Sequence, residues 1–284
     1  MTDIIVIGAS SGPGRLLYEA LQHRGENVVG IARESRGLTD TDTSRFVALD
    51  ATDTGALRKL VDGSRVLIHC SRPEILTALL QAGADIERLI AVGSTRIYTR
   101  FPDDKCTRLA AMAHTIWMGD IPATILHPTM IYGAPGLNNI ERVIRAAKLS
   151  PWIPLPDKGS ALIQPVHAED VVRALLICLE DENTCGRTLV IAGRSPVTYR
   201  EFIELCIETG GAECRVVSIP YLLLSLLGLI TRFIPGLPGI GQDEIRRLRE
   251  NKDFDISDMT NLLGSEPLDL ATGLKRAFGP PIKT

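Results

Sequence analysis

A short glycine-rich turn near the N-terminus constrains the fold of this chain more than any other feature. Residues 4–7 form an unbroken apolar run, glycines follow at positions 8, 12 and 14, and an amphipathic stretch begins at Leu16. This order predicts a buried strand, a tight turn and a helix. Glycines in such a turn let backbone N–H groups approach a pyrophosphate and let the helix pack closely on the sheet. An ordinary tight turn is the alternative. The predicted dinucleotide-binding residues of the turn are Gly8, Ser10, Ser11, Gly12, Pro13 and Gly14.

Short apolar runs alternate with helical patterns through the first half of the chain. The expected strands are residues 4–7, 27–32, 45–49, 65–69, 87–92 and 122–126. Buried strands separated by amphipathic helices are typical of a parallel sheet. We therefore predict an α/β fold, a Rossmann-type doubly wound parallel sheet with a smaller, discontinuous α/β lobe.

Ligands of such sheets bind outside the carboxyl ends of the strands. Arg33 ends the second strand, where an acidic residue would accept from the ribose of NAD and an arginine would pair with the 2′-phosphate of NADP. Glu34 stands one position late, so the sequence favours NADP over NAD, with a solvated loop charge as the alternative for Arg33. Further cofactor contacts are expected at the ends of the next two strands. These are Asp50, Ala51, Cys70 and Ser71.

Composition excludes several classes of function. The 284 residues carry a net charge of −3, with no basic face for nucleic acid. The six cysteines are scattered, so we expect reduced thiols, no disulfide frame and no metal site. The start Met-Thr-Asp has no basic stretch, which favours a cytoplasmic protein. The apolar run 219–230 is too short to cross a bilayer. A buried helix is the favoured interpretation of that run, and a surface for a membrane or a partner is the alternative.

Four ordered segments resemble the short-chain dehydrogenase/reductase superfamily, in its two-lobed nucleotide-sugar epimerase and dehydratase branch. The glycine loop is similar to its cofactor loop, although the spacing G-x-x-x-G-x-G departs from the usual G-x-x-G-x-x-G of that branch. The other three segments are 92–98 (VGSTRIY), 126–133 (LHPTMIYG) and 164–171 (QPVHAEDV). The resemblance spans nearly the whole chain and implies NAD(P)-dependent chemistry on a nucleotide sugar or a similar carbonyl compound.

One departure from the family concerns catalysis. Family enzymes use a Tyr-x-x-x-Lys pair, in which the lysine lowers the pKa of the phenol and binds the nicotinamide ribose. At the expected place this chain has Phe101 and Lys105, and phenylalanine has no proton to give. Ser94 matches the family serine. The catalytic residues implied are Ser94, Tyr98 and Lys105, with packing beneath the strand as the alternative for Tyr98 and an ordinary helix charge as that for Lys105.

Further contacts are predicted around the sixth strand. We expect Pro128, Thr129 and Ile131 to contact the cofactor together with Lys105, and His167 to satisfy backbone groups. The predicted substrate-binding residues are Thr95, His127, Asn139 and Gln164.

Two functions remain open from the sequence. The first is an NAD(P)-dependent oxidoreductase or epimerase. The second is a catalytically weak or inactive cofactor-binding protein with a structural or regulatory role. We expect a monomer or homodimer, with a cofactor domain formed by residues 1–132 plus 163–192 and a substrate lobe formed by 133–162 plus 193–284.

Overall fold

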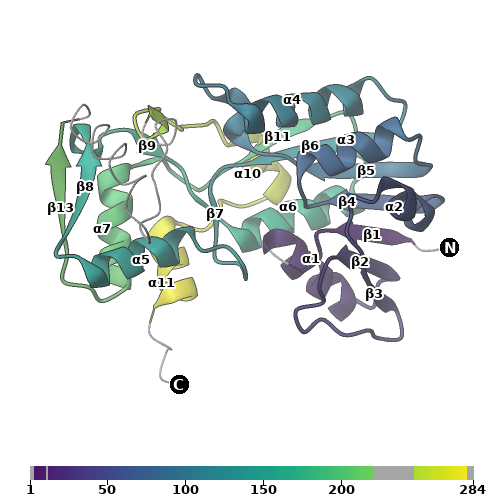
Figure 1. The fold of residues 1–284 in the computed structure, drawn as a ribbon, viewed down its shortest axis with the longest axis horizontal. Helices are drawn as coiled ribbons and strands as arrows, with labels where there is room; N and C mark the ends of the chain where they lie inside the picture. The colour runs from purple at the N-terminus through teal and green to yellow at the C-terminus, as the bar shows by residue number, and fades with distance from the viewer. Residues whose placement is uncertain (1–2, 11, 221–245, 280–284) are drawn as a thin grey trace.

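A seven-stranded sheet forms the larger part of the structure, in the order β11-β6-β5-β4-β1-β2-β3 (Figure 1). The computed structural model describes residues 3–10, 12–220 and 246–279. All neighbouring strands of this sheet are parallel. The strand order reverses between β1 and β4, which confirms the predicted doubly wound Rossmann-type fold. The strands are β1 (Ile4–Ile7), β2 (Val28–Ala32), β3 (Ser44–Ala48), β4 (Ser64–His69), β5 (Ile86–Val92), β6 (Ala123–Pro128) and β11 (Thr188–Ile191).

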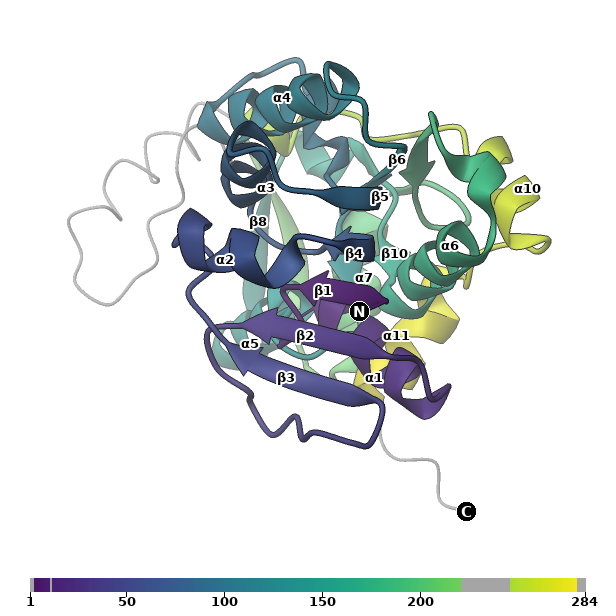
Figure 2. The ribbon, with the colours of Figure 1, turned by 90° about the vertical axis from the view of Figure 1, so that its right-hand side faces the viewer.

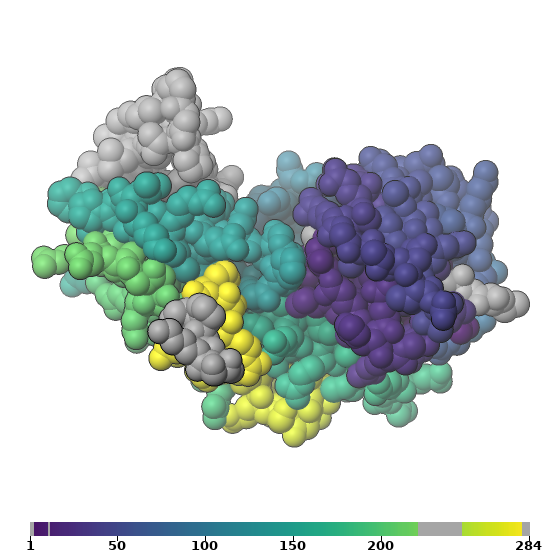
Figure 3. Space-filling view, turned by 90° about the horizontal axis from the view of Figure 1, so that it is seen from below, coloured from purple at the N-terminus to yellow at the C-terminus, as the bar shows by residue number. Residues whose placement is uncertain are grey.

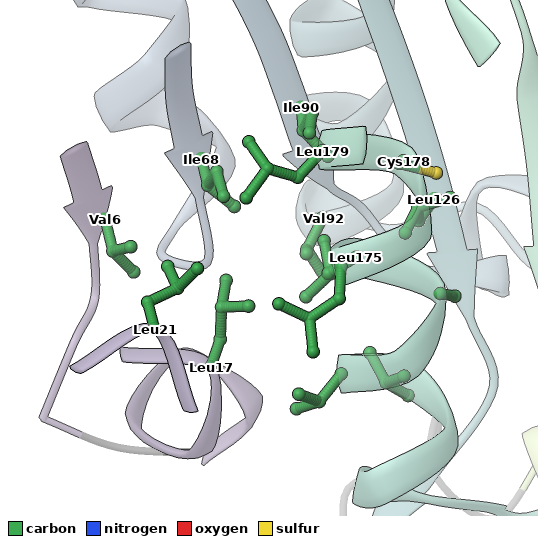
Figure 4. Packing of buried hydrophobic residues seen from close by; sticks show 14 of the residues in the cluster. Val6, Leu17, Leu21, Ile68, Ile90, Val92, Leu126, Leu175, Cys178 and Leu179 are labelled. Atoms are coloured by element: carbon green, nitrogen blue, oxygen red, sulfur yellow. The ribbon is translucent and has the colours of Figure 1, made fainter. Parts of the chain in front are cut away.

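Helices cover both faces of this sheet (Figure 2). Side chains alternate along β1, so that Ile4 and Val6 enter one core cluster while Ile5 and Ile7 enter the other. Figure 4 shows the first cluster, in which Leu17 and Leu175 meet between the sheet and two helices. That face carries α1 (Gly12–His23), α6 (Ala168–Glu180) and α10 (Ser257–Leu263), and the other carries α2 (Thr54–Val61), α3 (Pro73–Gln81) and α4 (Asp104–Trp117).

A smaller α/β region gathers beside the sheet, and Figure 3 shows the two masses side by side. Its separate core includes Tyr132, Ile140, Phe202 and Leu274. Its helices are α5 (Asn139–Leu149), α7 (Tyr199–Thr209) and α11 (Leu270–Phe278). Its strand pairs are β7 (Ile131–Tyr132) with β10 (Val166–His167), β9 (Leu162–Ile163) with β12 (Val197–Thr198), and β8 (Trp152–Pro156) with β13 (Arg215–Ile219). Single 3₁₀ turns are η1 (Thr95–Tyr98), η2 (Asp157–Gly159) and η3 (Glu182–Thr184).

Capping residues fix the starts of two of the helices. Asp53 accepts from the Ala56 N–H at the start of α2, and Thr198 forms a capping box with Glu201 at the start of α7. The proline-rich segment 150–160 contains β8. In the described residues β8 has a single neighbour, β13, and an edge strand tolerates proline.

None of the helices in the described ranges has both the length and the apolar character needed to cross a membrane. Most of the apolar run 219–230 lies outside the described residues. The two interpretations of that run therefore stay predictions.

Candidate functional site

The glycine loop leaves β1 in a conformation that favours glycine. Gly8 has φ +89° and Gly12 has φ +57°, both in the left-handed region. A Cβ atom at Gly8 would lie 2.6 Å from the Cys70 carbonyl oxygen, and one at Gly14 would lie 2.5 Å from the Gly8 carbonyl oxygen. The loop therefore packs β1, α1 and the end of β4 together where the strand order reverses, which is where such sheets bind ligands.

Gly12 opens α1 and lies under the segment that follows β7. A Cβ atom at Gly12 would meet only the Leu137 side chain, at 3.8 Å. The Gly12 N–H donates to the Pro135 carbonyl oxygen over 2.8 Å, and Pro13 has no N–H. A helix start is a common site for a phosphate, and a phosphate bound at the Gly12 N–H would replace the Pro135 carbonyl. Ser11 lies outside the described residues.

Basic residues follow β2 at the same edge of the sheet. Arg33 is exposed directly after β2, and the Arg36 carbonyl accepts a hydrogen bond from Arg15 Nη1 over 3.1 Å. Hydrogen bonds from the Thr52 N–H and hydroxyl, with a smaller contribution from the charge of Arg33, lower the pKa of Asp50. Asp50 is thus an exposed carboxylate that caps its own turn, beside a basic group.

Small residues line the ends of β3 and β4. Ala51 is buried, while Ser10 and Ser71 are half-buried. Burial raises the pKa of the Cys70 thiol to about 12, so this thiol is neutral and a poor nucleophile.

Ser94 and Tyr98 come together around His127 at the ends of β5 and β6. The Ser94 N–H donates to His127 Nδ1 over 3.1 Å, and Ser94 Oγ accepts from the Arg96 N–H. The Tyr98 ring lies edge-on to the His127 ring, with 5.6 Å between centroids. Because burial lowers the pKa of His127 to about 4, the imidazole is neutral near pH 7. Its proton is then on Nε2, since Nδ1 accepts.

Tyr98 is half exposed, and in the described residues its ring lies beside the aromatic rings of His127 and Phe254. Its ring also lies 6.3 Å from that of Phe254, and burial raises the pKa of its phenol. Phe101 and Lys105 are both exposed, Lys105 in the first turn of α4. Within the described part of the chain, direct contacts therefore join Ser94, Tyr98 and His127, and none of these contacts involves Lys105.

The segment 96–103, which carries Tyr98, is held by residues far along the chain. Asp103 pairs with Arg96 and with Arg247, the latter over 3.0 Å, and its hydrogen bond from Arg96 is the main cause that lowers its pKa to about 2. Glu250 is buried and accepts from the Thr99 hydroxyl over 2.8 Å. Sequence reasoning missed Arg247 and Glu250, because no local pattern marks a contact across about 150 residues.

Several predicted ligand residues hold backbone groups instead of facing open space. The Thr95 hydroxyl donates to the Pro128 carbonyl, and the Thr129 hydroxyl donates to the Gln164 carbonyl. Gln164 Nε2 donates to the Gly193 carbonyl and its Oε1 accepts from the Phe254 N–H. Their ligand roles stay predictions, as do those of the remaining residues after β6. Ile131 is half-buried in β7, and Asn139 is exposed at the start of α5.

His167 Nδ1 accepts a hydrogen bond from the Glu169 N–H. This bond supports the prediction that His167 satisfies backbone groups. No group of three or more histidine, cysteine or acidic residues within the described ranges is arranged to hold a metal ion. A cavity of about 400 Å³ beside the start of α6 contains none of the predicted site residues.

Comparison with known proteins gives weak but consistent matches. The family model described as the NAD dependent epimerase/dehydratase family matches residues 4–75. The uncharacterised protein YbjS of Escherichia coli (strain K12) is 24% identical over 316 residues, 93% of each chain. The mitochondrial NADH-ubiquinone oxidoreductase 40 kDa subunit of Neurospora crassa is 25% identical, over 94% of this chain and 76% of that protein.

Solved structures share the fold. A UDP-glucuronic acid 4-epimerase from Bacillus cereus in complex with NAD matches with a TM-score of 0.75 at 18% identity, over 97% of this chain and 95% of that chain. The epimerase Mth375 from Methanothermobacter thermautotrophicus also gives a TM-score of 0.75, at 16% identity, over 98% and 92%. The matching family is described as NAD dependent and the Bacillus cereus structure contains NAD, so neither match supports the predicted preference for NADP.

Proposed function

We propose that this chain is an oxidoreductase or epimerase of the NAD-dependent epimerase/dehydratase type, because that family's model matches residues 4–75 and solved epimerases share the fold. Its substrate class is a nucleotide sugar or a similar carbonyl compound. The observation that carries the proposal is the close packing of Gly8 and Gly14 at the point where the strand order reverses. The proposed cofactor domain is residues 1–132 plus 163–192, and the proposed substrate lobe is 133–162 plus 193–284.

The cofactor supplies hydride transfer when bound, and the chain positions the substrate and manages the proton. The Ser94 hydroxyl oxygen accepts from the Arg96 N–H, which leaves the hydroxyl hydrogen to donate to a substrate oxygen. Tyr98 reaches solvent and would give its phenolic proton to that oxygen as negative charge develops there. Because the Tyr98 pKa is raised rather than lowered, Tyr98 is a proton donor near neutral pH and a poor base.

The choice of cofactor depends on the basic edge after β2. NADP would place its 2′-phosphate near Arg33 and Arg36, while the family and its solved relatives favour NAD. Binding of NADPH and NADH to the Arg33→Ala variant separates the two. If Arg33 binds the 2′-phosphate, the variant binds NADPH about tenfold more weakly and binds NADH as before. Arg58→Ala, at an exposed arginine of α2, is the matched control and keeps both affinities.

A second function has its own supporting observations. Phe101 stands where family enzymes have their catalytic tyrosine. The Gly12 N–H already donates a hydrogen bond to the Pro135 carbonyl. One relative is named as a subunit of a larger oxidoreductase. Binding a dinucleotide without turnover, as a structural or regulatory protein, is therefore the alternative. Under either function we expect a monomer or homodimer in the cytoplasm.

Turnover separates the two functions. If the protein is an oxidoreductase, we expect it to oxidise NADH or NADPH in the presence of keto-sugar nucleotides, as followed by the loss of cofactor absorbance. If it is an epimerase, the cofactor is regenerated in each turnover, and formation of the epimeric sugar nucleotide is the measure of turnover. The Tyr98→Phe variant should lower kcat by about 10²- to 10⁴-fold, the usual contribution of a positioned acid. Tyr18→Phe removes the phenolic hydroxyl of a residue that α1 buries in the protein core, and this variant should leave kcat unchanged. Cofactor binding without turnover of any carbonyl substrate tested would favour the second function.

A further inference from the structure

The His127 ring occupies the space above the backbone of Gly93, at the end of β5. A Cβ atom at Gly93 would lie 2.5 Å from His127 Nδ1 and 2.7 Å from its Cε1. The residue is 1% exposed, so a methyl group added at position 93 would push the ring against its packed neighbours. The His127 ring can therefore take this position only because residue 93 is a glycine without a side chain.

One edge of this ring fixes the backbone that carries the Ser94 hydroxyl. His127 Nδ1 accepts the Ser94 N–H over 3.1 Å. Ser94 has an extended backbone and caps η1, the turn that leads to Tyr98. Leaving this N–H unpaired at a half-buried position is unfavourable, so the bond restrains the start of the turn.

The same ring supports the Tyr98 side chain. The two ring planes meet at 76°, an edge-to-face contact, and such contacts fix relative orientation. Tyr98 is 50% exposed, so His127 and Phe254 supply the aromatic support that holds its phenol at the carboxyl edge of the sheet. His127 thus contacts both residues to which we assign the chemistry.

We propose that His127 is the positioning residue of this site, aligning the Ser94 hydroxyl and the Tyr98 phenol through the Ser94 N–H bond and the edge-to-face contact. The proposal rests on the proposed function for its kinetic consequence. Its structural part stands without turnover. The role differs from substrate binding, because the acceptor atom of the imidazole is used by the backbone.

Two substitutions separate the acceptor from the volume of the side chain. In His127→Asn the amide oxygen can take the place of Nδ1, whereas His127→Leu keeps a similar volume and has no acceptor. We expect His127→Leu to lower kcat by about 10- to 100-fold, as for a small misplacement of reacting groups. The KM for the cofactor should stay within about twofold, and His127→Asn should recover most of kcat.

Amide hydrogen exchange of Ser94, measured by NMR without cofactor or substrate, tests the structural part. The Ser94 amide should exchange slowly in wild-type protein and in His127→Asn, and at least tenfold faster in His127→Leu. Gly93→Ala provides a second test because its methyl group displaces the ring, and it should also speed Ser94 exchange. If His127→Leu does not fold, the comparison of Ser94 exchange is made between Gly93→Ala and His127→Asn.

The outcomes are distinguishable from failure of the proposed function. If wild-type protein has no turnover but Ser94 exchange follows the expected order, the proposed function fails and the structural role of His127 stands. If the protein is active and neither Ser94 exchange nor kcat changes in His127→Leu or Gly93→Ala, the positioning role is overturned. Equal loss of kcat in His127→Asn and His127→Leu, with unchanged Ser94 exchange, would also overturn it.

Discussion

Gly8 and Gly14 are both required to be glycine, but for different physical reasons. Gly8 combines a left-handed backbone with a close contact to the Cys70 carbonyl, whereas Gly14 has the close contact alone. Gly25 has the left-handed backbone alone, with nothing within 4 Å of an added Cβ atom. These three positions separate backbone strain from steric overlap within one protein.

Alanine substitutions at these glycines test that separation. Gly25→Ala should cost about 1 kcal/mol of unfolding free energy, as strain in the left-handed region. Gly14→Ala should cost about 1–3 kcal/mol from overpacking and should weaken cofactor binding, while Gly8→Ala should cost more than either. Urea unfolding measures the free energies. A Gly14→Ala variant as stable as wild type would contradict the packing account of the loop.

Two buried histidines make stability depend on pH. Burial lowers the pKa of His69 and of His127 to about 4, below the ordinary value of ~6.5. The unfolded chain therefore binds protons first as the pH falls, and stability is lost from about pH 6.5 down to about pH 4. Each histidine should contribute a loss on the order of 2 kcal/mol between pH 7 and pH 5.

Urea unfolding at pH 7 and pH 5 measures this loss. His127→Asn and His69→Gln should each reduce the difference between the two pH values by about 2 kcal/mol. His23→Gln, at an exposed histidine, should keep the wild-type difference. Burial also lowers the pKa of His167, so a smaller difference should remain in the double variant His69→Gln/His127→Asn. A double variant that keeps the full wild-type difference would contradict the assignment.

At the scale of elements, the sequence predicted those whose signals are local. The apolar runs and their alternation with helical patterns predicted the strands of the sheet within a few residues of their bounds. The pair of β8 and β13 was not predicted, because its pairing joins residues about 60 positions apart and proline obscured β8. The polar contacts of Glu250 with segment 96–103 were missed because they also join residues far apart in the sequence.

The ion pairs of Asp103 should stabilise η1 beyond the cap that Asp103 gives to α4. Asp103→Asn keeps a side chain able to cap the helix and removes the charge that pairs with Arg96 and Arg247. We expect a loss of about 1–3 kcal/mol, as for breaking a partly buried pair, and faster amide exchange at Ile97 and Thr99. Asp53→Asn, a cap with no ion pair in the described part of the chain, should change stability by less than about 0.5 kcal/mol.

At the scale of the whole molecule, the parallel sheet brings residues from distant parts of the sequence to one edge. The fold class could be predicted because the alternation of strands with helices and the glycine loop are both visible in short stretches of the sequence. The neighbours of Tyr98 could not, because His127 and Phe254 reach it from β6 and from the C-terminal part of the chain. The prediction of catalytic residues therefore depended on resemblance, while their mutual geometry came from the structure.

The account depends on a dinucleotide binding at the glycine loop, and thermal unfolding with added NADH or NADPH tests this most directly. A ligand that binds only the folded state at a hundredfold excess over its Kd should stabilise it by about 2.7 kcal/mol. We predict that at least one of the two raises the Tm by several degrees in wild-type protein and much less in Gly14→Ala. An unchanged Tm with both cofactors at millimolar concentration would contradict the account.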